Sequence, residues 1–248
     1  MKIKKILISQ PEPLNGNSPY SEILSKYNLA IDFFPFFRIE PLTAKEFRSQ
    51  KINLTDFTAV VFTAKSQIDA YFKIAEELRV TIPDTMKYFC LSEAVANYIQ
   101  KYIVYRKRKI FVGRGTLESV LELVGTKHKE ENFLIPTTDD LKTDIHKHFL
   151  KAKLQHSIAV LNKTIFNDLT VLDVFKYDLL IFYSPSDLKS LQENYPSSDF
   201  SKVLFASFGQ SATKALMNAK INPLFTAPTP EAPSISKALS IYMENNKL

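Results

Sequence analysis

The sequence contains a single cysteine, Cys90, in 248 residues. One thiol cannot form an internal disulfide, which is typical of proteins of a reducing cytoplasm. No apolar stretch approaches the roughly 18 to 20 residues that cross a membrane. The basic start at Met1 leads into an apolar run that Ser9 and Pro11 interrupt, and this run is too short for a secretion signal. We therefore expect a cytoplasmic protein without a membrane partner.

Motifs of cofactor-dependent and covalent chemistry are also missing. Gly113-Arg114-Gly115 lacks the third glycine of a dinucleotide-binding turn, and neither a phosphate-binding loop nor a G-x-S-x-G turn occurs. His146 and His148 lie two residues apart on a predicted helix, so they point to opposite faces and do not form a metal motif. Cys90 lies in a predicted buried strand, which favours an inert thiol. We expect no metal and no cofactor.

The chain is basic, with a formal net charge of +6 and a pI near 9.1. This balance favours an anionic partner but does not specify which anion. The only dense basic run, at residues 106–109, leads directly into the apolar Ile110-Phe111-Val112, as expected for a solvated approach to a strand. Binding of nucleic acid through this run is the less favoured alternative, and we expect no nucleic acid partner.

The length of the chain fits two lobes of roughly 110 to 130 residues better than one compact domain. Short β-rich apolar runs alternate with stretches of helical period, which indicates parallel sheets covered by helices. In the predicted helix 65–78, Ile68, Tyr71, Phe72 and Ala75 form one apolar stripe. The predicted strands are 5–9, 31–37, 59–63, 88–91, 109–112, 133–136, 157–161, 178–183, 203–208 and 223–226.

Two pairs of segments repeat along the chain. Val61-Phe62-Thr63-Ala64-Lys65 lines up with Ile181-Phe182-Tyr183-Ser184-Pro185, and each is a buried strand that leads into a helix. Leu91-Ser92-Glu93 and Phe208-Gly209-Gln210 follow at similar spacing. The repetition predicts two similar lobes, each a doubly wound parallel sheet.

The strand ends are the expected binding positions. A helix that begins there offers unpaired backbone N–H groups and a positive dipole end, and such ends bind carboxylates. Thr63, Ser92, Ser184, Gly209 and Ser211 lie at four turns of this kind. For any one of them, simple capping of the following helix is the plainer interpretation. Four such turns in duplicated positions favour a site.

The order and spacing of six segments are more specific than any one of them. The segments are Val61-Phe62-Thr63-Ala64-Lys65, residues 83–95, residues 101–109, Phe182-Tyr183-Ser184-Pro185-Ser186, residues 208–215 and residues 227–234. With this set the chain resembles the uroporphyrinogen-III synthase family, in the form found in Bacteroidetes-type bacteria, over essentially its whole length.

The resemblance implies an architecture. The first lobe would comprise residues 1–36 and 165–248, and the second lobe, with two extended strand crossings that join the lobes, residues 37–164. The fold class is then α/β, with two similar doubly wound parallel-sheet lobes and a cleft between them. We also expect a monomer.

The resemblance also implies an activity. Enzymes of this family cyclise hydroxymethylbilane, a linear tetrapyrrole with eight carboxylates, to uroporphyrinogen III. The reaction belongs to haem biosynthesis, loses water, inverts the last ring through a spiro intermediate and needs no cofactor. Catalysis of this kind depends more on positioning than on acid–base chemistry.

The sequence departs from the family at two positions. Asn162 stands where relatives usually place a tyrosine proposed to assist loss of the hydroxyl, and Ala64 replaces a serine. An amide can hydrogen-bond a leaving hydroxyl but is not a phenolic acid. If the missing tyrosine matters to loss of the hydroxyl, Asn162→Tyr should raise turnover with little change in stability, because a strand crossing that faces a cleft has room for a ring. The alternatives are that Tyr183 has taken over the role, or that the chain is an impaired paralogue that binds a tetrapyrrole or another polyanion without turnover.

The candidate site residues share positions at predicted strand ends or crossings, and we expect them to line the interlobe cleft. The catalytic candidates are Asn162 and Tyr183, and the substrate-binding candidates are Thr63, Lys65, Ser92, Glu93, Thr137, Thr138, Ser184, Ser186, Gly209, Gln210, Ser211 and Thr213.

Overall fold

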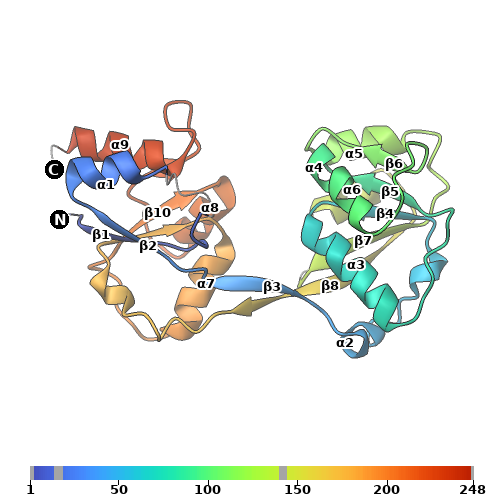
Figure 1. Cartoon of the computed structure of the whole chain (residues 1–248), viewed down its shortest axis with the longest axis horizontal. Helices are drawn as coiled ribbons and strands as arrows, with labels where there is room; N and C mark the ends of the chain where they lie inside the picture. The colour runs from blue at the N-terminus through green and yellow to red at the C-terminus, as the bar shows by residue number, and fades with distance from the viewer. Residues whose placement is uncertain (1–2, 14–18, 140–143, 247–248) are drawn as a thin grey trace. The chain divides into compact units, whose positions relative to one another are not determined.

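The structure, a computed structural model, describes residues 3–13, 19–139 and 144–246 (Figure 1). The chain divides into two compact units. Unit 1 comprises Met1–Arg38 and Phe166–Leu248, and unit 2 comprises Ile39–Ile165. Each unit contains one sheet dominated by parallel strand pairs, so the predicted α/β class with parallel sheets is confirmed.

Unit 1 has a five-stranded parallel sheet in the order β11-β10-β9-β1-β2. Its strands are β1 (Lys5–Ile8), β2 (Ala30–Phe33), β9 (Leu179–Phe182), β10 (Leu204–Phe208) and β11 (Thr226–Ala227). Its helices are α1 (Ser21–Tyr27), η3 (Val174–Lys176), α7 (Pro185–Asn194), α8 (Gln210–Asn218) and α9 (Ile235–Asn245).

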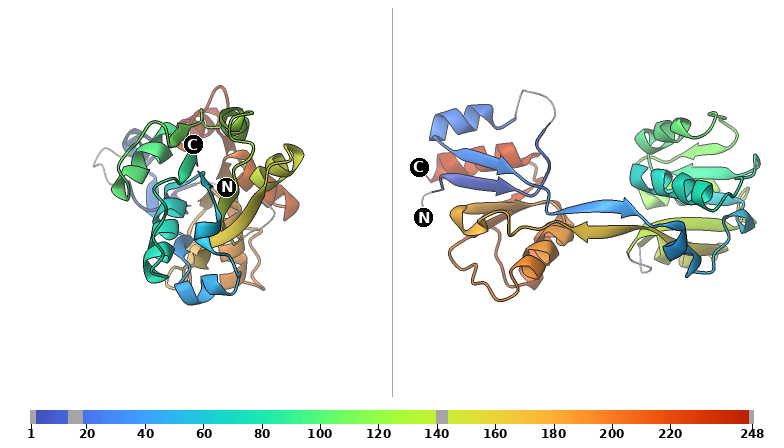
Figure 2. Two further views of the ribbon diagram at one scale, coloured as in Figure 1. Left: turned by 90° about the vertical axis from the view of Figure 1, so that its right-hand side faces the viewer. Right: turned by 60° about the horizontal axis from the view of Figure 1, so that its bottom comes forward.

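Helices cover both faces of the unit 1 sheet (Figure 2). Alternate residues of a strand point to opposite faces. Ile181 in β9 therefore packs with α1 and α9, while Leu180 and Phe182 pack with α7 and α8. β9 is buried along its whole length, which explains why all of its residues are apolar.

Unit 2 has a six-stranded sheet in the order β3-β8-β7-β4-β5-β6. Its strands are β3 (Phe37–Pro41), β4 (Ala59–Phe62), β5 (Lys87–Cys90), β6 (Ile110–Val112), β7 (Phe133–Thr138) and β8 (His156–Phe166). Its helices are α2 (Ala44–Arg48), η1 (Leu54–Asp56), α3 (Lys65–Glu77), α4 (Glu93–Tyr98), η2 (Ile99–Lys101), α5 (Leu117–Val124) and α6 (Asp144–Lys151).

The core of unit 2 lies in two layers. Phe62 and Val60 in β4 pack with α2, α3 and α4 on one face, while Val61 packs with α5 and α6 on the other. Cys90 in β5 is buried in the first layer, and burial raises the pKa of its thiol to about 12. The thiol therefore stays protonated at neutral pH.

Three predicted strands differ clearly from those observed. The predicted strand 223–226 overlaps β11 only at Thr226. The predicted strand 31–37 is interrupted, because β2 ends at Phe33 and β3 begins at Phe37. Pro35 lies in the gap, and proline has no N–H group for the ladder. The predicted strand 157–161 is longer than expected, since β8 continues to Phe166. Both β3 and β8 cross the boundary between the units.

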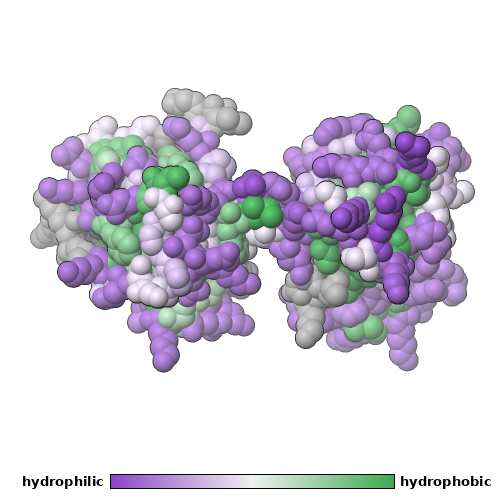
Figure 3. All heavy atoms as spheres, turned by 90° about the horizontal axis from the view of Figure 1, so that it is seen from below, coloured by the Kyte–Doolittle hydropathy of each residue, from purple (hydrophilic) through white to green (hydrophobic). Residues whose placement is uncertain are grey.

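The surface seen in Figure 3 is mostly hydrophilic in both units. Large exposed apolar side chains include Val104, Val171 and Met217, which lie far apart along the chain. In the described ranges, no helix is both long enough and apolar enough to span a membrane.

Candidate functional site

The predicted site residues form two groups, one in each unit. Both groups lie at or just beyond the carboxyl ends of parallel strands, where ligands of doubly wound sheets bind. The unit 2 group follows β4 and β5 or lies in β7 and β8, and it contains Thr63, Lys65, Ser92, Glu93, Thr137, Thr138 and Asn162. The unit 1 group follows β9 and β10 and contains Tyr183, Ser184, Ser186, Gly209, Gln210, Ser211 and Thr213.

The first duplicated pair of turns is closed by its own side chains. In unit 2, Gln67 Oε1 accepts hydrogen bonds from the backbone N–H groups of Thr63 at 2.8 Å and Ala64 at 3.2 Å. In unit 1, Asp187 Oδ2 accepts from the N–H groups of Tyr183 and Ser184, each at 2.8 Å. These four N–H groups are therefore occupied. The expectation of unpaired donors in the first helical turn is wrong at α7, where Pro185 has no N–H group and that of Ser186 is bonded to Ser184. In the first turn of α3, the N–H groups of Lys65 and Ser66 have no hydrogen-bond partner among the described residues.

Gln67 and Asp187 are structural residues that the candidate list lacks. Both stand two residues beyond the aligned segments of the repeat and three residues after the helix cap, where a side chain can reach back to the cap N–H. In unit 1 the Ser184 hydroxyl also accepts from the N–H of Ser186 at 3.1 Å, which completes a capping box. The S-x-x-D pattern could have identified this one, whereas Ala64 hides the equivalent role of Gln67.

Asp187 is fully buried, and burial raises the pKa of its carboxyl to about 6, against the opposing effect of the backbone N–H donors. The unit 2 counterpart is the neutral amide of Gln67. A carboxylate in unit 1 thus titrates near pH 6 at the turn that carries Tyr183 and Ser184.

The second duplicated pair of turns is open. Neither Ser92, which precedes α4, nor Gly209, which precedes α8, caps its helix with a side chain. Among the described residues, the backbone N–H groups of Gln210 and Ser211 in the first turn of α8 have no hydrogen-bond partner. Unpaired N–H groups at the positive end of a helix are donors for an anion.

Gly209 has a backbone that favours glycine. Its φ is 87° and its ψ 146°, a region that residues with a Cβ rarely adopt. No atom lies within 4 Å of the place where a Cβ would stand, so the requirement is conformational rather than steric. Thr213 supports the turn, because its hydroxyl contacts Ser207 Oγ at 2.8 Å and donates to Gly209 O at 3.0 Å.

A hollow of about 360 Å³ lies at the carboxyl edge of the unit 2 sheet. Three of the predicted residues, Thr63, Thr137 and Thr138, line it together with Gln67, Leu91, Leu117, Pro136, Asp144 and Ile145. Thr137 is buried and its hydroxyl donates a long bond to Ala159 O at 3.4 Å. The lining is largely apolar and includes one carboxylate.

Lys65 and Glu93 are the exposed charged members of the unit 2 group. Lys65 opens α3, and its Nζ lies 5.4 Å from the centroid of the Tyr98 ring. Tyr98 belongs to α4, which begins with Glu93. Lys65 is therefore the cationic side chain that this group presents.

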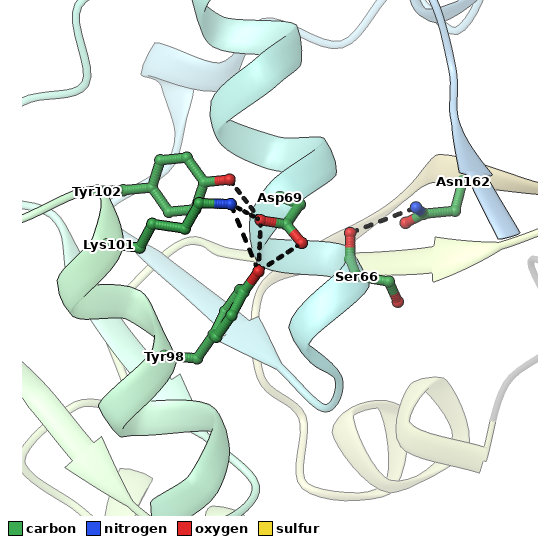
Figure 4. A network of polar contacts seen from close by, with 6 residues as sticks. All are labelled: Ser66, Asp69, Tyr98, Lys101, Tyr102 and Asn162. Atoms are coloured by element: carbon green, nitrogen blue, oxygen red, sulfur yellow. Dashed lines mark hydrogen bonds and ion pairs between the residues drawn. The ribbon is translucent and has the colours of Figure 1, made fainter. Parts of the chain in front are cut away.

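Asn162 is buried, with 1% of its surface exposed. Its amide Nδ2 donates to the backbone carbonyl of Ser66 at 3.3 Å, which ties β8 to the first turn of α3 (Figure 4). Its Oδ1 has no hydrogen-bond partner among the described residues. Asn162 is thus not an exposed position in this structure, and a tyrosine ring here would have to displace its neighbours. The effect of Asn162→Tyr on turnover stays a prediction.

Tyr183 lies in an aromatic cluster of unit 1. Its hydroxyl is 3.4 Å from the hydroxyl of Tyr20, and its ring packs on Phe208 with centroids 5.3 Å apart. Burial raises the pKa of Tyr183 above its ordinary value. The phenol stays protonated at neutral pH and can donate a hydrogen bond, but it is a weaker acid than a free phenol.

Three of the histidines take part in two separate side-chain contacts. His146 Nδ1 is 2.8 Å from His156 Nε2, and His148 contacts Glu118. Within the part of the chain that the structure describes, no three His, Cys, Asp or Glu side chains gather in a way that could hold a metal ion.

Comparison with family models identifies one family. Residues 18–237, most of the chain, match the family model described as Uroporphyrinogen-III synthase HemD. No curated protein matches the sequence.

Solved structures support the same fold. Uroporphyrinogen-III synthetase from Helicobacter pylori aligns with a TM-score of 0.61 and 16% identity, over 98% of this chain and 100% of that one. A mutant uroporphyrinogen III synthase from Thermus thermophilus aligns with a TM-score of 0.57 and 12% identity, over 98% of this chain and 99% of that one. At such low sequence identity, the structural similarity is evidence for the fold only.

Proposed function

Because the chain belongs to the uroporphyrinogen-III synthase family, we propose that it is an active enzyme that converts hydroxymethylbilane to uroporphyrinogen III. The family consists of cyclising lyases of tetrapyrrole biosynthesis. The finer proposal concerns how the residues of this chain hold and turn over the substrate.

The main observation behind this proposal is the open turn at the start of α8. A substrate with eight carboxylates needs anion donors that are not used within the protein, and the N–H groups of Gln210 and Ser211 meet this condition. The open turn after Ser92 and the exposed ammonium of Lys65 add donors in unit 2. We propose that carboxylates of the substrate bind at each of these groups.

The chemistry that follows is mainly positioning. Fixing the carboxylates selects the conformation in which the last ring is attacked at its substituted carbon, instead of closing directly. Tyr183 is our candidate donor of a hydrogen bond to the departing hydroxyl, with water as the proton source. We assign Asn162 an indirect role, since its amide holds Ser66 in the turn that carries Lys65.

The second candidate function is that of a paralogue that binds a tetrapyrrole or another polyanion without turnover. It is favoured by Asn162, which is an amide where relatives have a phenol, and by the raised pKa of Tyr183, which weakens the remaining phenol as an acid.

A coupled assay distinguishes the two functions. Porphobilinogen and the preceding deaminase generate hydroxymethylbilane, and the uroporphyrinogens formed from it are oxidised to porphyrins, which are separated into type I and type III isomers. We expect mostly type III product with the chain present and type I without it. Exclusively type I product, together with tight binding of uroporphyrin III, would support the paralogue instead.

A further inference from the structure

The Lys65 side chain is exposed at the start of α3. Among the described residues, no carboxylate lies within ion-pair distance of its ammonium group. Asp69 stands four residues later on the same face of the helix, which is the usual spacing of an ion pair within a helix. The position of Asp69 thus makes it the expected partner of Lys65, yet the two are not paired.

The carboxylate of Asp69 accepts hydrogen bonds from residues of the neighbouring helical segment (Figure 4). The Tyr98 hydroxyl donates to its two carboxylate oxygens at 3.0 and 2.9 Å, and Lys101 Nζ lies 3.0 Å from Oδ1. The Tyr102 hydroxyl donates to Oδ1 as well. Three hydrogen-bond donors, one of them charged, therefore stabilise the negative charge of Asp69. The Lys65 ammonium remains available to bind another anion.

The same network fixes the ring on which Lys65 lies. The hydroxyl of Tyr98 is held at Asp69, and the face of its ring is 5.4 Å from Lys65 Nζ. A cation is attracted to the face of an aromatic ring, and this attraction limits the conformations of a long flexible side chain. A preorganised cation loses less freedom when it binds a ligand.

We propose that Tyr98, held by Asp69, is a positioning residue that presents the Lys65 ammonium to a carboxylate of the substrate. The inference rests on the proposed function, because it requires a polycarboxylate ligand at the unit 2 group. Tyr98 acts through Lys65 and does not touch the reacting atoms.

The expected effect appears in substrate affinity. Tyr98→Leu removes the ring and should raise KM about threefold, the size of a cation–π contact at an exposed site, while kcat stays the same. Tyr98→Phe keeps the ring but releases it from Asp69, so it should raise KM less. Both variants should also weaken the dependence of KM on salt, as is expected of Lys65→Met.

A double-mutant cycle tests the coupling. Steady-state KM and kcat are measured for the wild type, Tyr98→Leu, Lys65→Met and the double variant. We expect the double variant to have the KM of Lys65→Met, because the ring has no effect once the ammonium is gone. Tyr27→Leu is the matched control: its ring lies 5.1 Å from Lys26 Nζ in unit 1, outside the candidate groups, and KM should not change.

Titration with uroporphyrin III, an octacarboxylate, separates this inference from the proposed function. A wild type that binds but does not turn over would refute the proposed function, and the same four proteins would then be compared by Kd, with the same coupling expected. Multiplicative effects of the two substitutions on KM and Kd would overturn the inference and leave the proposed function intact. Unchanged affinity in Tyr98→Leu and Tyr98→Phe would also overturn it.

Discussion

Gly209→Ala is expected to raise KM about tenfold and to destabilise the protein by about 1–3 kcal/mol. The stability loss arises because alanine is strained at a φ of 87° and a ψ of 146°. The loss of affinity arises because relief of this strain turns the Gln210 and Ser211 N–H groups away from a bound carboxylate. A charge-assisted hydrogen bond of about 1.5 kcal/mol corresponds to a factor of about ten.

Gly115→Ala separates the two effects. Gly115 also has a φ of 87° and no atom within 4 Å of a built Cβ, but it lies outside the candidate groups. Both variants should lose comparable stability in urea unfolding, and only Gly209→Ala should show the higher KM in the coupled assay. An unchanged KM in folded Gly209→Ala would argue against the α8 turn as a binding position.

Asp187→Asn is expected to remove a pH-dependent loss of stability. The folded pKa of about 6 lies above the value of about 3.9 for an unperturbed aspartate. The folded protein therefore binds the proton more tightly, and the stability that this contributes is lost as the pH rises from about 4 to about 6. A shift of two units corresponds to at most about 3 kcal/mol.

Urea unfolding of the wild type and Asp187→Asn between pH 4 and pH 8 measures this change. The stability of the variant relative to the wild type should grow by up to about 3 kcal/mol across that range, since asparagine can still accept from the Tyr183 and Ser184 N–H groups. Gln67→Glu is the reciprocal variant and should create the same pH dependence in unit 2. A difference that does not vary with pH would show that Asp187 does not titrate in this range.

Periodicity was sufficient to predict an α/β protein with parallel sheets, whereas the discontinuous first lobe and the two crossings were expected only from the family resemblance. Strands such as β4 and β9 are buried on both faces, so their apolar runs are unambiguous, and α3 carries a regular apolar stripe. The break at Pro35 could have been predicted, because a proline cannot donate to a ladder. The extension of β8 beyond residue 161 was expected only from the family resemblance, as a crossing between the lobes, because its last residues are polar or partly exposed and lack a clear strand pattern.

The site was only partly predictable. The repeat placed the candidate residues at strand ends, but it did not distinguish the closed turns from the open ones. That distinction depends on Gln67 and Asp187, whose side chains fold back on the backbone. The contact of Lys65 with Tyr98 and the burial of Asn162 depend on packing between distant segments, which sequence periodicity does not report.

Residue-resolved amide hydrogen exchange with and without bound uroporphyrinogen III tests the central claim most directly. The claim is that substrate carboxylates bind at the open turn and not at the turn closed by Asp187. The N–H groups of Gln210 and Ser211 should gain protection on binding, while those of Tyr183 and Ser184, already bonded to Asp187, should not change. Protection gained at Tyr183 and Ser184 but not at Gln210 and Ser211 would contradict the account.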